Sequence, residues 1–333
     1  MHRSADQSPL RLNICLHDLS ELTQIRERML FHATLVRWVV NPIPLQETCM
    51  RSVVVTGTST GIGRGIAKVL TARGFRVFGS VRKKTDAERL SAELGSRFVP
   101  LLFDVTDEAA VHTAAAEVRA ALGGETLAGL VNNAGIAVAG PLLKLPINTF
   151  RWQIDVNLVG AVIVIQAFAP LLGIDRQLKG KPGRIVNISS VGGRVATPFL
   201  APYHASKFGV EGLSESLRRE LLCYEIDVIV IAPGAVATAI WDKVDEVDVT
   251  PYINTPYAPA LERLRAYMLA LGKRGLPPER LGHAVMHALT TSRPKVRYAV
   301  TPQPFQDWLG RNLPKRLIDR MIGRWLGLLP ARQ

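Results

Sequence analysis

Cysteine is scarce in this chain of 333 residues, which contains only Cys15, Cys49 and Cys223. Their positions match neither the paired spacing of a zinc site nor a disulfide framework, and an odd number suits a reducing compartment. The sequence therefore predicts no metal site, and we expect the cysteines to have no chemical role. A reducing compartment also favours a cytoplasmic protein.

The N-terminal region lacks an uninterrupted apolar run of membrane-spanning length. Its most apolar stretch, residues 29–40, is broken by His32 and Arg37, so it is too short and too charged to cross a bilayer. No convincing signal-peptide cleavage site follows it. Because Met50 directly precedes the first predicted strand, we expect residues 1–49 to be a poorly ordered extension or an artefact of an upstream start codon.

Acidic residues are outnumbered, and the formal net charge is +13. Such a charge favours nucleic acid or an anionic membrane as a partner. However, no nucleic-acid-reading motif is present, and more than half of the excess falls within residues 293–333. We therefore expect no nucleic-acid partner.

The rest of the chain alternates β-branched apolar runs with helical segments, which favours a single α/β domain. The predicted strands comprise residues 52–56, 76–81, 98–103, 130–135, 185–188, 228–231 and 296–300. A long apolar helix is predicted over residues 148–172. The expected fold is a doubly wound Rossmann-type domain over residues 50–301, with a seven-stranded parallel sheet and the strand at Val53 in its centre.

A serine, a tyrosine and a lysine follow the strand at residues 185–188 with a suggestive spacing. Ser190 stands at the strand's carboxyl end, Tyr203 comes thirteen residues later, and Lys207 four after that. Residues 203–217 have helical spacing, so Tyr203 and Lys207 share one face. A lysine cation can favour the phenolate of a tyrosine, and a serine hydroxyl can hold a substrate oxygen. This set could exchange the proton when an alcohol and a ketone interconvert.

A glycine-rich turn joins the first strand to the first helix of the domain. Gly57, Gly61 and Gly63 lie where the backbone of a dinucleotide-binding fold approaches a pyrophosphate, which then rests on the free N–H groups of the helix. The spacing is G-x3-G-x-G rather than G-x-G-x-x-G. A glycine cluster alone also fits an ordinary tight turn.

Taken together, these motifs resemble the short-chain dehydrogenase/reductase family of non-extended type, over roughly residues 50–301. Local stretches such as VFGSVRKKTDAERL and YHASKFGVEGLSESL resemble the branch of 17β-hydroxysteroid dehydrogenase type 1 and retinol dehydrogenase. The resemblance implies an oxidoreductase that interconverts a lipophilic alcohol with its ketone or aldehyde. It implies Asn157 as a fourth catalytic residue, which shapes its helix and holds a water linking Lys207 to solvent. It also implies a homodimer or tetramer.

The same resemblance implies further cofactor contacts along the chain. The glycine-loop signature adds Ser59, Thr60 and Ile62, and Tyr203 and Lys207 would also contact the cofactor. Asp104 and Val105 resemble an adenine-binding pair, although Asp104 or Asp107 could equally cap the next helix. The remaining expected contacts are Asn133, Ala134, Gly135, Pro233, Gly234, Val236 and Thr238.

The second strand ends without the acid that would bind the ribose hydroxyls of NAD(H). Arg82 stands there instead and could bind a 2′-phosphate in a bidentate way, so NADP(H) is favoured over NAD(H). Asp86 lies slightly later and keeps NAD(H) open.

After the Thr238 turn, residues 239–275 are expected to form a lid over the substrate, helical from Ala260. Residues 302–333 are expected to form a basic amphipathic tail. A helix over residues 314–329 would carry an apolar face and a cationic face. This pattern fits reversible contact with an anionic membrane, closure over the pocket, or a dimer contact.

The physiological substrate cannot be read from these patterns. Two other activities stay open beside the oxidoreductase: reduction of 3-oxoacyl groups on an acidic carrier protein, and non-catalytic sensing of a nucleotide. The complete Asn157, Ser190, Tyr203 and Lys207 set favours an enzyme over a sensor.

Overall fold

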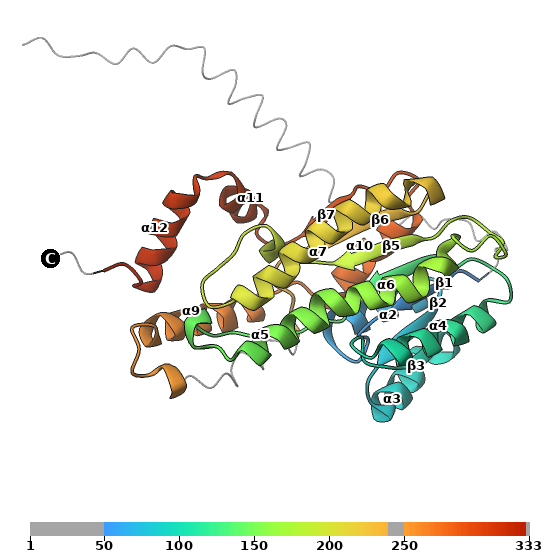
Figure 1. The fold of residues 1–333 in the computed structure, drawn as a ribbon, viewed down its shortest axis with the longest axis horizontal. Coiled ribbons are helices and arrows are strands. Elements are labelled where there is room, and N and C mark those ends of the chain that lie inside the picture. Colours follow the sequence, from blue (N-terminus) through green and yellow to red (C-terminus); the bar gives the residue numbers. More distant parts are fainter. Residues whose placement is uncertain (1–49, 239–249, 331–333) are drawn as a thin grey trace, which may run out of the picture. The chain divides into compact units, whose positions relative to one another are not determined.

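The computed structural model describes residues 50–238 and 250–330. Residues 1–49 and the first part of the expected lid, 239–249, lie outside the described residues. Seven parallel strands form one sheet with the order β3-β2-β1-β4-β5-β6-β7 (Figure 1). Their bounds are β1 (Ser52–Val55), β2 (Arg76–Val81), β3 (Phe98–Leu102), β4 (Gly129–Asn132), β5 (Arg184–Ile188), β6 (Asp227–Pro233) and β7 (Arg297–Val300).

The expected fold class is confirmed, with one difference in the strand order. The sequence predicts β1 in the centre of the sheet, but β4 takes the middle position and β1 lies beside it. The order reverses between β1 and β4, because β2 and β3 extend the sheet on one side of β1 while β5, β6 and β7 follow β4 on the other. A ligand-binding crevice forms at such a reversal in open α/β sheets.

Helices cover both faces of the sheet, and the strand residues alternate between them. Val54 of β1 packs with α4 (Glu108–Leu122) and α6 (Gly160–Phe168). Val53 and Val55 pack on the opposite face with α2 (Gly61–Ala72) and α10 (Pro278–Thr290). This two-residue alternation follows from the pleat, and apolar side chains on both faces fit a sheet buried on both sides. Helices α3 (Lys84–Leu94) and α7 (Ala201–Glu220) complete the two layers.

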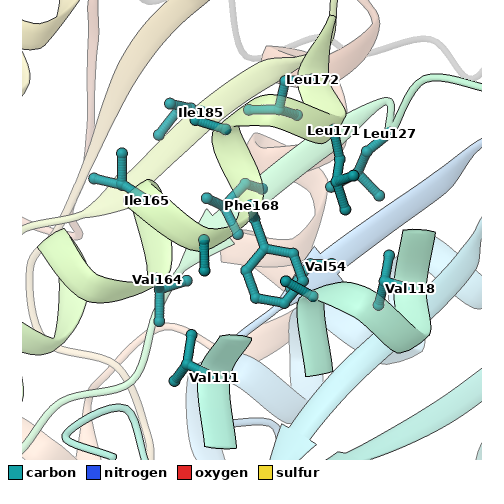
Figure 2. Packing of buried hydrophobic residues seen from close by; sticks show 14 of the residues in the cluster. Val54, Val111, Val118, Leu127, Val164, Ile165, Phe168, Leu171, Leu172 and Ile185 are labelled. Carbon is teal, nitrogen blue, oxygen red and sulfur yellow. The ribbon is translucent and has the colours of Figure 1, made fainter. Parts of the chain in front are cut away.

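Phe168 lies at the centre of the apolar cluster on the first face (Figure 2). Its ring is fully buried among side chains from α4, α6, the strands and the turn after α6, including Val54, Val164 and Leu171. Burial of apolar area on this scale holds the helices to the sheet. The strand ends that carry the polar motifs are thereby fixed in position.

The predicted helix over residues 148–172 is present but is not uniform. It comprises α5 (Ile147–Ile154), a π-helical turn (Asp155–Val159), α6 and a 3₁₀ turn (Ala169–Leu172). This stretch is long and apolar enough to cross a membrane by length and composition alone. Its position argues for a core helix instead, because Val164, Ile165 and Phe168 are buried in the cluster on the first face.

Helix α9 (Ala258–Lys273) lies in the connection between β6 and β7, and α11 (Pro304–Asn312) and α12 (Lys315–Leu326) follow β7. A third apolar cluster joins α9 to α12 through Leu261, Leu264 and Leu326, and includes Phe199 from the loop after Ser190. Short 3₁₀ turns lie between the main elements at Gly95–Arg97, Leu142–Lys144, Val191–Gly193, Leu221–Tyr224 and Thr250–Tyr252.

The expected tail helix begins close to the predicted position and ends earlier, at Leu326. Gly327 follows in the left-handed conformation with φ of 75°, a common helix C-terminus for glycine. Its apolar residues do not form one buried face. Ile322 and Leu328 pack toward α9. Leu317, Met321, Trp325 and Leu329 remain substantially exposed.

Candidate active site

The motif residues gather at the carboxyl ends of β1, β4, β5 and β6. The glycine turn follows β1, Asn133 follows β4, Ser190 follows β5, and Gly234 follows β6. Because these strands are parallel neighbours, their ends meet along one edge of the sheet. Helix α7 brings Tyr203 and Lys207 to the same edge.

Lys207 is 7% exposed, and its amine lies between α7 and β5. The Nζ atom donates a hydrogen bond to the backbone oxygen of Ile188 at 2.9 Å. Burial penalises the charged ammonium and lowers the pKa of Lys207 to about 8. The amine also lies 5.9 Å from the centre of the Tyr203 ring.

Tyr203 lies in the first turn of α7, facing Ser190. Burial raises the pKa of the Tyr203 phenol above its ordinary value, while a hydrogen bond with Ser190 acts in the opposite direction. The sequence predicts that Lys207 lowers this pKa, whereas in the cofactor-free protein the effects on it come from burial and from Ser190, and burial is the larger. The phenol is therefore protonated near neutral pH. This state suits donation of a proton to a carbonyl oxygen.

Ser190 is held by its own loop. Its Oγ accepts a hydrogen bond from the backbone N–H of Gly192 at 3.0 Å, so its hydroxyl hydrogen is available for the bond with Tyr203 that acts to lower the pKa of the phenol. On the other side of the loop, Arg297 donates to the Ser190 backbone oxygen at 3.4 Å. Arg297 in turn forms an ion pair with Glu211 of α7 at 3.0 Å.

Asn157 stands in the π-helical turn and is 3% exposed. Its side-chain oxygen accepts from the Ile136 N–H at 2.8 Å, and its amide donates to the Ile136 oxygen at 3.0 Å and to Ser206 at 3.1 Å. Ser206 donates to the Tyr203 backbone oxygen at 2.7 Å. Asn157 therefore connects the segment after β4 with the helix that carries Tyr203. π-helical turns often occur at functional sites.

A small cavity of about 10 Å³ separates Asn157 from Lys207. Thr56, Asn132 and Asn187 also line it, and the Oδ1 atom of Asn132 is buried without a hydrogen-bond partner among the described residues. A polar cavity of this size has room for about one water molecule. The side chain of Asn157 is already bonded to Ile136 and Ser206, so its expected role in holding a water depends on this cavity rather than on a free amide.

The glycine loop after β1 has the geometry of a phosphate cradle. Gly57 and Gly61 have φ of 69° and 57°, which favour glycine. A Cβ at Gly57 would lie 2.9 Å from the Ala134 backbone, and one at Gly63 would lie 2.5 Å from the Asn133 amide. Thr60, the residue before α2, makes no side-chain cap, and the first turn contains no acid. The free N–H groups of that helix end can therefore accept an anion.

Thr56 and Asn133 lock this loop to the segment after β4. The Thr56 hydroxyl accepts from the backbone N–H groups of Asn133 and Ala134, both at 3.0 Å. The Asn133 amide donates to the backbone oxygens of Thr56 and Gly57 at 2.8 and 3.1 Å. Asn133 and Ala134 are thus fixed beside the glycines. The next residue, Gly135, lies close to Asn157, since a Cβ at position 135 would be 3.2 Å from the Asn157 Oδ1 atom.

The turn after β6 lies beside the glycine loop. A Cβ at Gly61 would lie 3.3 Å from the Thr238 methyl group, so this turn contacts the glycine loop directly. Val236 is buried and pairs as an isolated bridge with Leu276. Gly234 follows Pro233, the last residue of β6, and packs against Thr301. Ser59, Thr60 and Ile62 complete the set expected around the cofactor.

Arg82 follows β2 with a side chain that is 67% exposed. It lies 3.6 Å from Asp104, and Asp104 also accepts from the backbone and hydroxyl of Thr106. Partial burial works against ionisation, but the bonds from Thr106 and Arg82 hold the pKa of Asp104 below its ordinary value. Asp107, not Asp104, caps α4. The Val105 side chain is buried against Gly160 and lines the small cavity, so only its backbone is available to an adenine ring.

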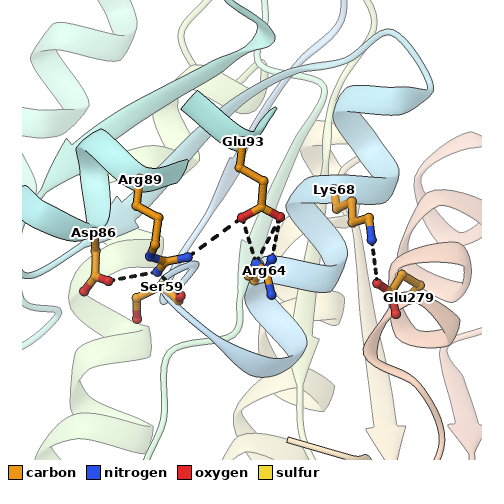
Figure 3. Close-up of polar contacts among 7 residues, drawn as sticks. All are labelled: Ser59, Arg64, Lys68, Asp86, Arg89, Glu93 and Glu279. Atoms are coloured by element: carbon orange, nitrogen blue, oxygen red, sulfur yellow. Dashed lines mark hydrogen bonds and ion pairs between the residues drawn. The ribbon is translucent and has the colours of Figure 1, made fainter. Parts of the chain in front are cut away.

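A network of charges on α2 and α3 was not anticipated from the sequence (Figure 3). Arg89 donates to the Ser59 backbone oxygen at 2.7 Å and to Asp86 at 2.8 Å, and Glu93 holds Arg64. Asp86, which kept NAD(H) open, is therefore committed to Arg89. The signal was present in the helical spacing of Asp86 and Arg89, but the contact with Ser59 depends on the tertiary fold.

Among residues 50–238 and 250–330, no group of three or more His, Cys, Asp or Glu side chains could hold a metal ion. The donors that do converge are hydroxyls, amides, backbone N–H groups and cations. Such a set suits a phosphate-containing organic cofactor.

Comparison with known proteins agrees with this geometry. Residues 51–248 match the short chain dehydrogenase family model. An NADPH-dependent 3-dehydrocapnine reductase from Ornithobacterium rhinotracheale is 38% identical over 82% of this chain and 96% of its own length. 17-Beta-hydroxysteroid dehydrogenase type 6 from Bos taurus is 33% identical over 80% of this chain and 85% of its own. A solved short-chain dehydrogenase from Streptomyces avermitilis has a TM-score of 0.67 and 25% identity, covering 84% of this chain and 97% of that one.

The chain belongs to the short-chain dehydrogenase/reductase family. It is an oxidoreductase that interconverts alcohols and carbonyl compounds with a nicotinamide cofactor, and its relatives include the retinol and steroid dehydrogenases expected from its local motifs. Members of this family are typically oligomeric and act on small substrates.

The buried amine of Lys207 gives a testable pH dependence. Its pKa is about 8 in the folded chain and 10.5 in an exposed lysine, so the unfolded chain binds more protons between these values. The stability of the wild-type protein attributable to Lys207 therefore rises with pH across that window. We expect Lys207→Met to be more stable than wild type by an amount that is largest below pH 8. That advantage should shrink by about 3 kcal/mol as pH approaches 10.5.

Urea unfolding of both cofactor-free proteins at pH 7.5, 8.5, 9.5 and 10.5 measures this difference. Comparing the two proteins cancels the titration of all other groups. Parallel stability curves over the whole range would show that folding does not lower the pKa of Lys207.

Proposed function

We propose that this protein is an NADP(H)-dependent dehydrogenase/reductase of lipophilic alcohols and ketones or aldehydes, with Asn157, Ser190, Tyr203 and Lys207 as its catalytic set. The observation that carries the proposal is the convergence of Tyr203, Ser190 and Lys207 beside an uncapped glycine loop. A bound nicotinamide cofactor supplies the hydride to a carbonyl carbon, or takes it from an alcohol carbon.

In reduction, the Ser190 hydroxyl donates a hydrogen bond to the substrate oxygen, because its own Oγ is already an acceptor for Gly192. Tyr203 then transfers its proton to the oxygen as the hydride arrives at the carbon. The raised pKa of Tyr203 keeps the phenol protonated beforehand. A protonated Lys207 would stabilise the phenolate left behind and would bind the ribose of the cofactor.

Proton return to Tyr203 follows the buried polar groups. Lys207 and Asn157 both line the small cavity. This cavity is large enough for about one water molecule. We assign this cavity to the water that links Lys207 with solvent, with Asn157 holding the π-helical turn that bounds it.

Arg82 supports the choice of NADP(H). It is exposed at the end of β2, no acid occupies the following two positions, and Asp86 is paired with Arg89. A guanidinium binds a phosphate with two parallel hydrogen bonds, which a ribose hydroxyl cannot match. The relative from Ornithobacterium rhinotracheale is also NADPH-dependent.

The lipophilic substrate class is supported by the apolar cluster beyond Ser190. Phe199, which follows the catalytic loop, contacts Tyr257 edge to face at 5.8 Å and packs with Tyr252 and Leu261. The relatives named for retinol and steroids point to the same class. Assembly as a homodimer or tetramer is part of the proposal, since α7 leaves Phe208 exposed on its outer face.

The catalytic assignment predicts that Tyr203→Phe loses the proton donor while keeping the ring. Turnover of NADPH with apolar ketones should fall by about 10²-fold or more, because a positioned acid typically contributes that much. NADPH binding, followed by quenching of tryptophan fluorescence, should change less than about twofold. Near-wild-type turnover in this variant would show that another group donates the proton.

The cofactor assignment predicts a selective effect of Arg82→Ala. Loss of a charged hydrogen bond of about 1.5–3 kcal/mol should raise the KM for NADPH by roughly tenfold or more and leave that for NADH nearly unchanged. Lys84→Ala, which removes a nearby cation at the start of α3, is the matched control. Equal effects of Arg82→Ala on both cofactors would contradict a 2′-phosphate contact.

We also propose reversible contact with an anionic membrane through α12. Leu317, Met321 and Trp325 form one exposed row, and Arg316, Arg320 and Arg324 form the next row of the same helix. Nearby α11 exposes Phe305 and Trp308. A helix with exposed apolar and cationic rows can lie at a lipid surface with its cations at the phosphates. This arrangement would give the site access to substrate dissolved in the bilayer.

Flotation with vesicles of phosphatidylcholine and phosphatidylserine tests this contact. We expect the wild-type protein to float at low salt and to be released at about 0.5 M salt, where charge is screened over a few ångströms. Met321→Glu/Trp325→Glu should not float, whereas Leu222→Glu, a change at a 71% exposed leucine outside α12, should float like wild type. If the wild-type protein does not float with the vesicles at low salt, contact with an anionic membrane through α12 is excluded.

A further inference from the structure

His204, the neighbour of Tyr203, has a role that the catalytic set does not explain. It lies in the first turn of α7 and is 6% exposed. Both ring nitrogens are bonded: Nδ1 to the Gly192 backbone oxygen at 2.7 Å, and Nε2 to the Thr197 backbone nitrogen at 2.9 Å. The ring therefore spans the loop that follows Ser190 at two points.

These partners fix the protonation of the ring. A backbone N–H can only donate, so the Nε2 atom facing Thr197 must be an acceptor and carry no hydrogen. The hydrogen of the neutral ring is then on Nδ1, which donates to Gly192. The Thr197 hydroxyl lies 3.0 Å from the same Nε2 atom and therefore also donates to it. Burial lowers the pKa of His204, which is consistent with the neutral form.

Gly192 connects His204 directly to Ser190. Its oxygen accepts from His204, while its N–H donates to the Ser190 Oγ at 3.0 Å. The contact is close, because a Cβ at position 192 would lie 2.9 Å from the His204 Cε1 atom. A movement of Gly192 would therefore change the direction of the N–H group that sets the Ser190 hydroxyl.

Few other bonds hold the middle of this loop. The 3₁₀ turn Val191–Gly193 closes on Ser190 and Val191, and the far end is fixed where Gly140 donates to the Phe199 oxygen at 2.8 Å. Between them, Thr197 is held by its two bonds to His204. From these contacts we infer that His204 is a positioning residue, which orients the Ser190 hydroxyl toward the substrate oxygen through Gly192.

This inference rests on the proposed roles of Ser190 and Tyr203. His204 acts on Ser190 only indirectly, through Gly192. The His204 ring also lies edge to face with the Tyr203 ring, with the two ring centres 5.6 Å apart. The link through Gly192 distinguishes His204 from a buried histidine that only stabilises the core. Its loss should reduce turnover more than it reduces cofactor binding.

Three substitutions separate the two bonds of the ring. His204→Asn places an amide donor near the position of Nδ1 and can keep the bond to Gly192. His204→Gln places its amide near Nε2 and can keep only the bond to Thr197. His204→Phe keeps the shape of the ring and neither bond. Each is compared with wild type in kcat, KM for ketone, NADPH binding and melting temperature.

We expect His204→Asn to retain kcat within about threefold, and His204→Gln and His204→Phe to lose roughly tenfold or more, since small misplacements of a reacting group are costly. NADPH binding should stay within about twofold in all three. Equal losses of kcat in the asparagine and glutamine variants would overturn the inference. So would a phenylalanine variant that turns over like wild type.

The asparagine and glutamine pair decides the question even if the phenylalanine variant does not fold, because both members remain polar. Tyr203→Phe, measured alongside, separates this inference from the proposed function. An inactive Tyr203→Phe with an unaffected His204 series would refute only the positioning role. An active Tyr203→Phe would refute the catalytic assignment itself.

Discussion

The arrangement of polar groups in the site depends on one buried amine. The Lys207 nitrogen is buried between α7 and β5 and makes one hydrogen bond, to the Ile188 oxygen. Removing an ammonium from water is unfavourable unless polar groups surround it. The side chains of Asn157, Asn132 and Asn187 around the adjoining cavity provide that polar setting. The asparagines at the ends of β4 and β5 and in the π-helical turn thus line the same cavity as this one lysine.

The glycine loop depends on a similar arrangement of hydroxyls and amides. Hydrogen bonds between Thr56 and Asn133 connect the residues that directly follow β1 and β4. These bonds are between groups that the sheet itself cannot satisfy, because the strands have ended. These bonds fix the backbone of the glycine loop to the segment that follows β4. Rigid placement of N–H groups is what makes anion binding at a helix end effective.

Local patterns in the sequence were enough to predict the strands, the glycine turn and the Ser190, Tyr203 and Lys207 set. Each of these depends on residues close together in the chain. The position of β4 in the middle of the sheet could not be predicted in this way, because strand order depends on the path of the connections. The contacts of Arg89 with Ser59 and of Arg297 with Glu211 join residues 30 and 86 positions apart. The raised pKa of Tyr203 depends on burial that is visible only in the folded chain.

The π-helical turn at Asp155–Val159 changes the rotation of one half of its helix relative to the other. A π-helical turn contains more residues than an α-helical one, so α5 is rotated about the axis relative to the direction that an unbroken helix would give it. Deleting one residue within the turn would restore regular winding and rotate α5 by about 100°. Gln153, whose amide holds Ile136 and Val138, would then face away from the segment after β4. Insertion or deletion of even one residue in this helix would therefore move the side chains that hold the segment after β4.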